Sequence, residues 1–252
     1  MLKTAERFST RIAHYIKYRP GYPSEIISEL TKECHLTPSS VVADIGSGTG
    51  KSAEPFLKNG NVVFGVEPNP GMRQAAEEIF REVARFKSVE GNAENTALPN
   101  NGVDFVIAAQ AFHWFDQAAF RVEAKRILKP QGWVVLFWNG RKLESTPFLE
   151  EYEKMMVEFG TDYQEVRHEN VERQVPDFFK PAAFTSRIFP NQQIFDLDGL
   201  QGRVRSSSYT PEPDNPNFQP MMARLEEVFA KYQRNGRIVF EYDTRVFYGH
   251  LG

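Results

Sequence analysis

The fold of this chain is decided by residues 41–52, which read VVADIGSGTGKS. An apolar run leads into three alternating glycines, a pattern typical of a strand that ends in a loop whose backbone can touch a ligand. A tight strand-to-helix turn without a ligand is one interpretation. Three kinds of ligand-binding loop compete with it.

Two of these loops each fail at one position. A phosphate-binding loop, Gly-x-x-x-x-Gly-Lys-Ser/Thr, matches at Gly50, Lys51 and Ser52, but its first glycine falls on Ile45, whose side chain would obstruct the cradle. A dinucleotide fingerprint, Gly-x-Gly-x-x-Gly, begins at Gly46, but its third glycine falls on Lys51. Neither motif is complete.

The third loop, Asp-x-Gly-x-Gly-x-Gly, is met in full by Asp44, Gly46, Gly48 and Gly50. On these residues the sequence resembles the class I S-adenosylmethionine-dependent methyltransferases, of the methyltransferase domain 11 type. The resemblance implies that Asp44 serves the amino group of the cofactor's methionine part and that the glycine backbone approaches the same part. An acid suits this cationic donor, whereas it would repel a pyrophosphate.

Further motifs follow at spacings like those of the family. The resemblance implies that Glu67 accepts hydrogen bonds from the ribose hydroxyls and that Met72 lies beside the adenine; the alternatives are a solvated charge and a core methionine. Asn92 stands where the family has an aspartate that accepts a bond from the adenine amino group. Its amide oxygen can still accept, although an Asx turn is the alternative. The cofactor-binding residues implied by the resemblance are Tyr18, Arg19, Asp44, Gly46, Ser47, Gly48, Glu67, Pro68, Asn69, Met72, Asn92, Ala93, Gln110, Ala111 and Phe112.

Methyl transfer is expected at residues 110–116, which follow the fourth predicted strand, because ligands of open α/β sheets bind beyond the carboxyl ends of the strands. His113, with an unperturbed pKa of about 6.5, is the candidate catalytic residue. It is a general base, a substrate contact or a structural histidine, and these alternatives stay open; a carboxylate acceptor needs no base. Trp114, Tyr22 and Tyr209 are the candidate substrate-binding residues.

The nature of the acceptor is indicated by two features. The signatures of enzymes that methylate nucleic-acid bases (Asn/Asp-Pro-Pro-aromatic) and protein arginine (paired glutamates) are both missing. The N-terminal residues 8–23, with Phe8, Tyr15 and Arg19, resemble the trans-aconitate methyltransferase-like branch, in which this segment closes over the cofactor. The resemblance implies that Arg19 holds a carboxylate of the cofactor or of the acceptor; an exposed charge is the alternative. We therefore expect methylation of a small molecule, at the oxygen of a carboxylate or hydroxyl.

Strands and helices alternate along the chain, which predicts a parallel sheet covered on both faces. A helix capped by Asn69 is predicted to extend to Val83, and another begins at Asp116 and ends in a turn at Lys129-Pro130. Strict alternation predicts a final strand at 238–248. The predicted strands are 40–46, 61–67, 86–91, 103–109, 132–139, 184–195 and 238–248.

The resemblance implies the class I methyltransferase (Rossmann-like) fold: an α/β domain with a seven-stranded, mostly parallel sheet, an antiparallel last strand, helices on both faces and a helical cap. We expect one methyltransferase domain over residues 1–252. Its predicted parts are an N-terminal lid segment (1–35), a cofactor-binding core (36–140), a variable cap with the acceptor-side elements (141–235) and the final strand (236–252).

Composition limits the partners. The net charge of -3 offers no excess positive charge to neutralise a nucleic-acid backbone. One cysteine, Cys34, and scattered histidines give no metal-ligand spacing, and the longest apolar run, Trp133 to Trp138, is far shorter than the ~20 residues of a membrane span. We expect a cytoplasmic monomer or homodimer with no signal peptide, metal, nucleic acid or membrane partner. Two other functions stay open: a P-loop nucleotide hydrolase and a non-catalytic S-adenosylmethionine-binding protein.

Overall fold

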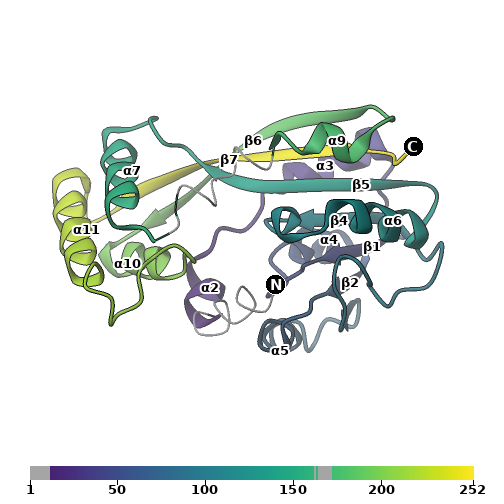
Figure 1. The fold of residues 1–252 in the computed structure, drawn as a ribbon, viewed down its shortest axis with the longest axis horizontal. Coiled ribbons are helices and arrows are strands. Elements are labelled where there is room, and N and C mark those ends of the chain that lie inside the picture. Colours follow the sequence, from purple (N-terminus) through teal and green to yellow (C-terminus); the bar gives the residue numbers. More distant parts are fainter. Residues whose placement is uncertain (1–11, 162, 164–171) are drawn as a thin grey trace.

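A seven-stranded sheet is the centre of the computed structural model, which describes residues 12–161, 163 and 172–252 (Figure 1). The strand order is β3-β2-β1-β4-β5-β7-β6. The first five strands pair in parallel, whereas β7 is antiparallel to both β5 and β6. The predicted mostly parallel sheet with an antiparallel last strand is therefore confirmed. The strands are β1 (Val41–Ile45), β2 (Val62–Val66), β3 (Phe86–Val89), β4 (Val103–Ala109), β5 (Leu128–Arg141), β6 (Phe184–Phe195) and β7 (Ile238–Gly249).

Helices cover both faces of this sheet. One face packs against α3 (Glu25–Cys34) and α4 (Ala53–Asn59) through a cluster that includes Leu30 and Phe56. The other face packs against α6 (Gln117–Ile127) and α9 (Val175–Phe179). Successive residues of β5 alternate between the two clusters, which explains why its sequence is a continuous apolar run rather than an alternating one.

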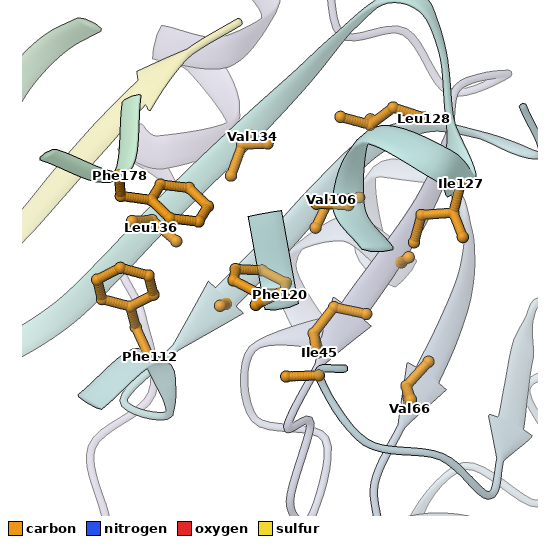
Figure 2. Packing of buried hydrophobic residues seen from close by; sticks show 14 of the residues in the cluster. Ile45, Val66, Val106, Phe112, Phe120, Ile127, Leu128, Val134, Leu136 and Phe178 are labelled. Carbon is orange, nitrogen blue, oxygen red and sulfur yellow. The ribbon is translucent and has the colours of Figure 1, made fainter. Parts of the chain in front are cut away.

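Aromatic packing on the second face fixes the segment that follows β4. Figure 2 shows Phe112, Phe120 and Phe178 grouped beside Val134 and Leu136 of β5. The ring centroids of Phe112 and Phe178 are 5.0 Å apart, in an edge-to-face arrangement. Phe112 is thus a core residue that anchors the short helix η1 (Phe112–Trp114) at the carboxyl end of the sheet.

The cap has a hydrophobic cluster of its own. Residues 238–241 of β7 pair with β6 alone, so this hairpin continues past the strands that pair with it and reaches the cap helices (Figure 1). Helix α2 joins the cap because the Tyr18 ring packs on Gly202, where an added Cβ would be 2.1 Å from the ring. The helices of this part are α2 (Ile12–Tyr18), α7 (Pro147–Phe159), α10 (Leu197–Arg205) and α11 (Phe218–Tyr232).

Two predicted boundaries are wrong. Helix α5 (Pro70–Ile79) stops before Val83 because the chain turns at Phe80, whose ring packs on Phe86. The turn predicted at Lys129-Pro130 is part of strand β5, which begins at Leu128 directly after α6. The pairing of β4 with β5 shifts register between Val103, which pairs with Leu128, and Phe105, which pairs with Trp133. Such a bulge accommodates a proline.

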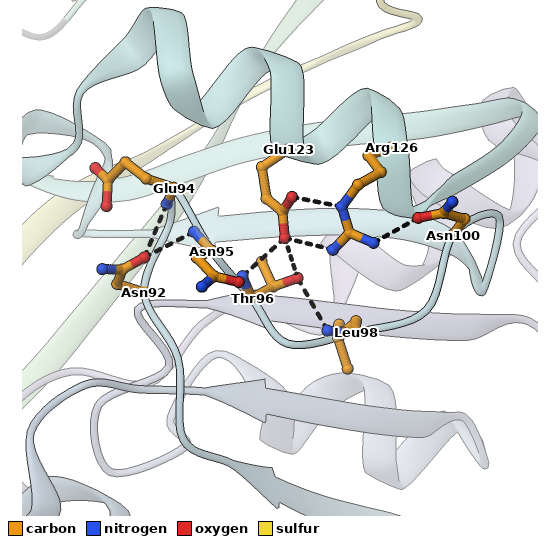
Figure 3. A network of polar contacts seen from close by, with 8 residues as sticks. All are labelled: Asn92, Glu94, Asn95, Thr96, Leu98, Asn100, Glu123 and Arg126. Carbon is orange, nitrogen blue, oxygen red and sulfur yellow. Dashed lines mark hydrogen bonds and ion pairs between the residues drawn. The ribbon is translucent and has the colours of Figure 1, made fainter.

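A polar network fastens the loop after β3 to helix α6 (Figure 3). The backbone N–H and the hydroxyl of Thr96 both donate to Glu123 Oε1, at 2.7 and 2.6 Å. Arg126 donates to the same carboxylate from Nε and Nη2, each at 2.7 Å. The bonds from Arg126, together with those from Thr96, outweigh burial and lower the pKa of Glu123 to about 2.

We expect Glu123→Gln to lower the free energy of unfolding at pH 7 by about 1 to 2 kcal/mol, because charge-assisted bonds to a buried carboxylate are lost. The folded pKa lies below the unfolded value, so the stabilisation is present above pH 4.5 and is lost as the pH falls toward 2. Urea unfolding at pH 7 and pH 3.5 should show the gap between variant and wild type narrowing. The control is Glu78→Gln, which breaks an exposed pair with Arg81 of the same spacing; an equal loss there would contradict the prediction.

Candidate active site

Asp44 lies at the centre of the sheet, paired with Gly65 of β2 and Ile107 of β4. Its side chain is fully buried. Ser52 Oγ donates to Asp44 Oδ2 at 2.6 Å, whereas Oδ1 has no hydrogen-bond partner among the described residues. Burial raises the pKa of this carboxyl to about 7. A buried acceptor atom without a partner is costly, so this position suits a ligand that brings a donor.

The three glycines of the loop all have positive φ angles: 68° at Gly46, 57° at Gly48 and 83° at Gly50. An added Cβ at Gly46 would lie 2.7 Å from the Cβ of Ala111, and at Gly50 it would lie 2.3 Å from the Phe80 ring. At Gly48 a Cβ would meet nothing within 4 Å. Packing therefore explains two of the glycines, while Gly48 borders open space.

Glu67, directly after β2, is bonded to the glycine loop. Its Oε2 accepts from the backbone N–H of Gly48, and its Oε1 accepts from that of Asn69, both at 2.9 Å. Burial raises the pKa of Glu67, partly offset by these two bonds. Asn69 in turn caps helix α5, since its Oδ1 accepts from the N–H of Met72 at 3.0 Å. Met72 is buried, and Pro68 is exposed.

Asn92 forms the Asx turn that was the alternative to adenine contact. Its Oδ1 accepts from the backbone N–H groups of Glu94 and Asn95, at 3.1 and 2.7 Å (Figure 3). The amide oxygen predicted to accept a bond from adenine is therefore engaged in the turn. Ala93, beside it, is buried.

The residues at which methyl transfer is expected follow the carboxyl end of β4. Gln110 has a φ of 57° and donates from Nε2 to the carbonyl of Asn139 at 3.2 Å. His113 is half-buried, with its ring centroid 4.4 Å from that of Trp114. Burial lowers the pKa of His113 to about 4, well below the value assumed from sequence. Trp114 is 36% exposed.

A cavity of about 670 Å³ lies between this end of the sheet and the cap. Tyr18 is not part of its wall, since the Tyr18 hydroxyl donates to Asp198 at 3.3 Å and its ring packs on α10. The cavity wall also leaves out the loop glycines, Glu67 and Asn92. It includes Lys51, which follows Gly50. The predicted residues that line the cavity are Arg19, Tyr22, Gln110, His113, Trp114 and Tyr209.

Sequence reasoning missed several wall residues, of which Asn139 is the clearest. It is buried at the carboxyl end of β5, where its Nδ2 donates to the carbonyl of Gly21 at 3.1 Å and its Oδ1 accepts from Thr244. A polar residue that ends an apolar strand was the signal that could have found it. The other missed wall residues include Arg141, Lys142 and Tyr163.

Parts of the predictions fall outside what is described. Phe8 and the other residues of the predicted lid segment before Ile12 belong to residues 1–11, on which the structure gives no description. Among the described residues, no helix has both the length and the apolar character that a membrane span requires. Within the same residues, no group of three or more acidic, histidine or cysteine side chains is arranged to hold a metal ion.

Comparison with known proteins gives consistent results. Residues 43–136 match the family described as a methyltransferase domain. An uncharacterized methyltransferase of Schizosaccharomyces pombe is 30% identical over 231 residues, which is 90% of this chain and 88% of that protein. A putative type II methyltransferase from Anaeromyxobacter dehalogenans has the same fold, with a TM-score of 0.65 at 18% identity over 93% of this chain and 98% of that chain. A methyltransferase from Geobacter sulfurreducens, solved with S-adenosyl-L-homocysteine, has a TM-score of 0.52 at 14% identity over 97% of each chain.

Proposed function

Because the chain belongs to the family of class I S-adenosylmethionine-dependent methyltransferases, we propose that it methylates an oxygen atom of a small-molecule acceptor, in a carboxylate or a hydroxyl group. The observation that carries this proposal is the cavity of about 670 Å³ that extends from Lys51, at the glycine loop, to Tyr209 in the cap. Its volume lies within the range of roughly 300 to 1,000 Å³ in which small-molecule sites fall.

The residues around the glycine loop fit the cofactor. Asp44 Oδ1, which has no partner among the described residues, would accept a hydrogen bond from the cofactor's amino group, and the open space at Gly48 would admit its methionine part. Glu67, held by Gly48 and Asn69, would accept from the ribose hydroxyls, and Met72 would border the adenine. The cofactor, when bound, supplies a methyl group on a positively charged sulfur. The other predicted cofactor contacts stay predictions, and the turn at Asn92 leaves its amide oxygen less available than the sequence suggested.

His113 and Trp114 border the acceptor in this proposal. The neutral ring of His113 can accept a proton from a hydroxyl, but a pKa of about 4 makes it a weak base for that step. A carboxylate is already deprotonated near neutral pH and needs no base. The lowered pKa of His113 therefore favours a carboxylate acceptor, which the ring contacts and orients.

We expect His113→Ala to lower kcat about 10- to 100-fold while leaving S-adenosylhomocysteine affinity unchanged, because positioning of the acceptor is lost and the cofactor residues are intact. S-adenosylhomocysteine release would be measured with a panel of small carboxylic acids and hydroxyl compounds, and cofactor affinity by calorimetry. The kcat of the wild type should stay level from pH 8 to about 5.5, since the His113 pKa is about 4 and protonation begins only below that range.

The matched control is His250→Gln, at an exposed histidine outside the cavity. Unchanged turnover in His113→Ala would remove both the base and the contact role. Binding of S-adenosylhomocysteine without turnover of any compound in the panel would instead support the non-catalytic alternative. The nucleotide-hydrolase alternative is disfavoured, because Ile45 is buried in the core and Ser52 is bonded to Asp44.

We also propose a cytoplasmic monomer or homodimer that acts on free small molecules. The net charge of -3 supports the lack of attraction to nucleic acid. Similarity to the trans-aconitate methyltransferase-like branch stays a prediction, since it rests on the aromatic residues and Arg19 of the N-terminal segment alone.

A further inference from the structure

The cap end of the cavity carries an unusual concentration of positive charge. Six basic and three acidic side chains line the cavity, although the chain as a whole has a net charge of -3. Two of the acids have cations of their own: Glu172 binds Arg245 at 2.6 Å, and Asp243 lies 3.5 Å from Lys142. Arg141 is paired with Glu153, outside the wall, whereas Arg19, Lys51 and Arg203 have no carboxylate partner among the described residues.

Arg203, on α10, is held by neutral groups. It is 5% exposed, and its guanidinium donates to the Tyr242 hydroxyl at 3.1 Å and to Ser207 Oγ at 2.9 Å. It also lies over the Phe240 ring at 5.6 Å. No carboxylate of the described part of the chain pairs with it. A buried cation without a counter-ion is costly, so this guanidinium is suited to an incoming anion.

Arg141, at the end of β5, offers an unused donor. Its Nη2 binds Glu153 and the Tyr163 hydroxyl. Its Nη1 is buried and has no hydrogen-bond partner among the described residues, and the side chain as a whole is 9% exposed. Arg141 lines the same cavity as Arg203, and the charges of both act on Tyr209 in the cavity wall.

Tyr209 lies in the positive electrostatic field of these arginines. It lines the cavity, and its ring packs on that of Tyr163 with centroids 4.9 Å apart. Burial alone raises the pKa of a phenol, but the charges of Arg203, Arg19 and Arg141 lower the pKa of Tyr209 below its ordinary value. This wall of the cavity therefore stabilises negative charge.

We propose that Arg203 and Arg141 form an anion subsite at the cap end of the cavity, which binds a carboxylate or phosphate group of the acceptor other than the group that is methylated. The guanidinium groups bind oxyanions through charge-assisted hydrogen bonds. The acceptor is then a small molecule with at least one anionic anchor, and its reacting oxygen lies toward His113. The assignment as an acceptor subsite rests on the proposed function, whereas binding of the anion itself does not.

The test is a thermal-shift titration of the full chain saturated with S-adenosylhomocysteine, at low ionic strength to limit screening. Succinate and inorganic phosphate are the anionic probes, and succinamide is the neutral probe of equal length. We expect succinate, phosphate or both to raise Tm by about 3 to 6 °C and succinamide to leave it unchanged. A larger shift with one anion identifies the kind of oxyanion that the subsite prefers.

Arg203→Gln and Arg141→Gln should each abolish the shift caused by the anion while preserving the shift caused by S-adenosylhomocysteine. Arg205→Gln is the control for the first, because Arg205 is exposed on the same helix and outside the cavity. Glu153→Gln is the control for the second, since it breaks the ion pair but keeps the guanidinium; it should retain the shift. If Arg203→Gln does not fold, the proposal is tested by the thermal shift that the anion causes in Arg203→Lys and Arg141→Gln.

An equal shift with succinamide, no shift with either anion, or a full anion shift in Arg203→Gln and Arg141→Gln would overturn the subsite. A protein that fails to bind S-adenosylhomocysteine but keeps the arginine-dependent anion shift would overturn the proposed function and leave the anion site in place. An adventitious surface effect would persist in all four variants and so would count against the proposal.

Discussion

Asp44→Asn should weaken S-adenosylhomocysteine binding about 100-fold, because the cofactor's ammonium group loses its charged acceptor. The wild-type carboxylate is buried with Oδ1 unpartnered among the described residues, and Ser52 occupies only Oδ2. Asparagine keeps the shape and the acceptor for Ser52. Calorimetric titration at pH 7.5 would measure the loss, and an unchanged dissociation constant would contradict the role of Asp44.

The same substitution should make the ligand-free protein more stable above pH 7. The folded pKa of Asp44, about 7, lies above its ordinary value of 3.8, so the cost of ionising the buried group lowers stability as the pH rises from about 4 to about 7. Removing the charge relieves this penalty by up to about 4 kcal/mol at pH 8, since the shift is about three pKa units and each unit corresponds to about 1.4 kcal/mol. A variant that loses affinity for S-adenosylhomocysteine but gains stability would show that Asp44 acts in binding and that its replacement does not damage the fold.

Wild-type affinity should also depend on pH. Binding of a cation requires the ionised carboxylate, so affinity falls by up to about tenfold per pH unit as the pH drops below 7. Titrations at pH 5.5, 6.5 and 7.5 would show this slope. Asp44→Asn is the control, because its affinity should be nearly constant over the same range.

Gly48→Val should lower S-adenosylhomocysteine affinity about 100-fold, with the fold retained. A Cβ at Gly48 enters space that is empty of protein atoms, and in our account the methionine part of the cofactor occupies that space. A valine side chain would exclude it. The φ of 57° adds backbone strain of about 1 to 2 kcal/mol, which lowers stability but does not by itself block a ligand.

Gly236→Val is the matched control for this substitution. Gly236 has a φ of 72°, and a Cβ there also meets nothing within 4 Å, but it lies in an exposed turn before β7 and outside the cavity. Thermal melts of the two variants should show similar losses of stability. Only Gly48→Val should lose affinity for the cofactor product. Equal affinities in the two variants would contradict the contact at Gly48.

The central strands could be predicted because burial on both faces leaves a direct mark on the sequence. Residues 103–109 are almost wholly apolar, and they form β4 at the predicted bounds. The start of β5 could not be predicted, since Lys129-Pro130 is typical of a turn in isolation. Its place in a strand depends on a bulge opposite Val103 and Phe105, which is a property of the paired strand.

The cofactor half of the candidate site follows from local motifs, because the loop after β1 and the end of β2 are each read within a few residues. The acceptor half of the candidate site does not follow from local motifs. Arg141 and Arg203 come from a strand and a helix that are distant in sequence, and only the folded cap brings them to one cavity. Asn92 shows a further limit: the same side chain suits an Asx turn or a ligand, and the hydrogen-bond partners decide between them.

The most direct test of the central claim is calorimetric titration of the wild-type chain with S-adenosylhomocysteine, NADH and MgATP under the same conditions. We expect binding of S-adenosylhomocysteine alone, with an affinity that Asp44→Asn reduces about 100-fold. Binding of MgATP or NADH in its place, or S-adenosylhomocysteine binding that is indifferent to Asp44, would contradict it.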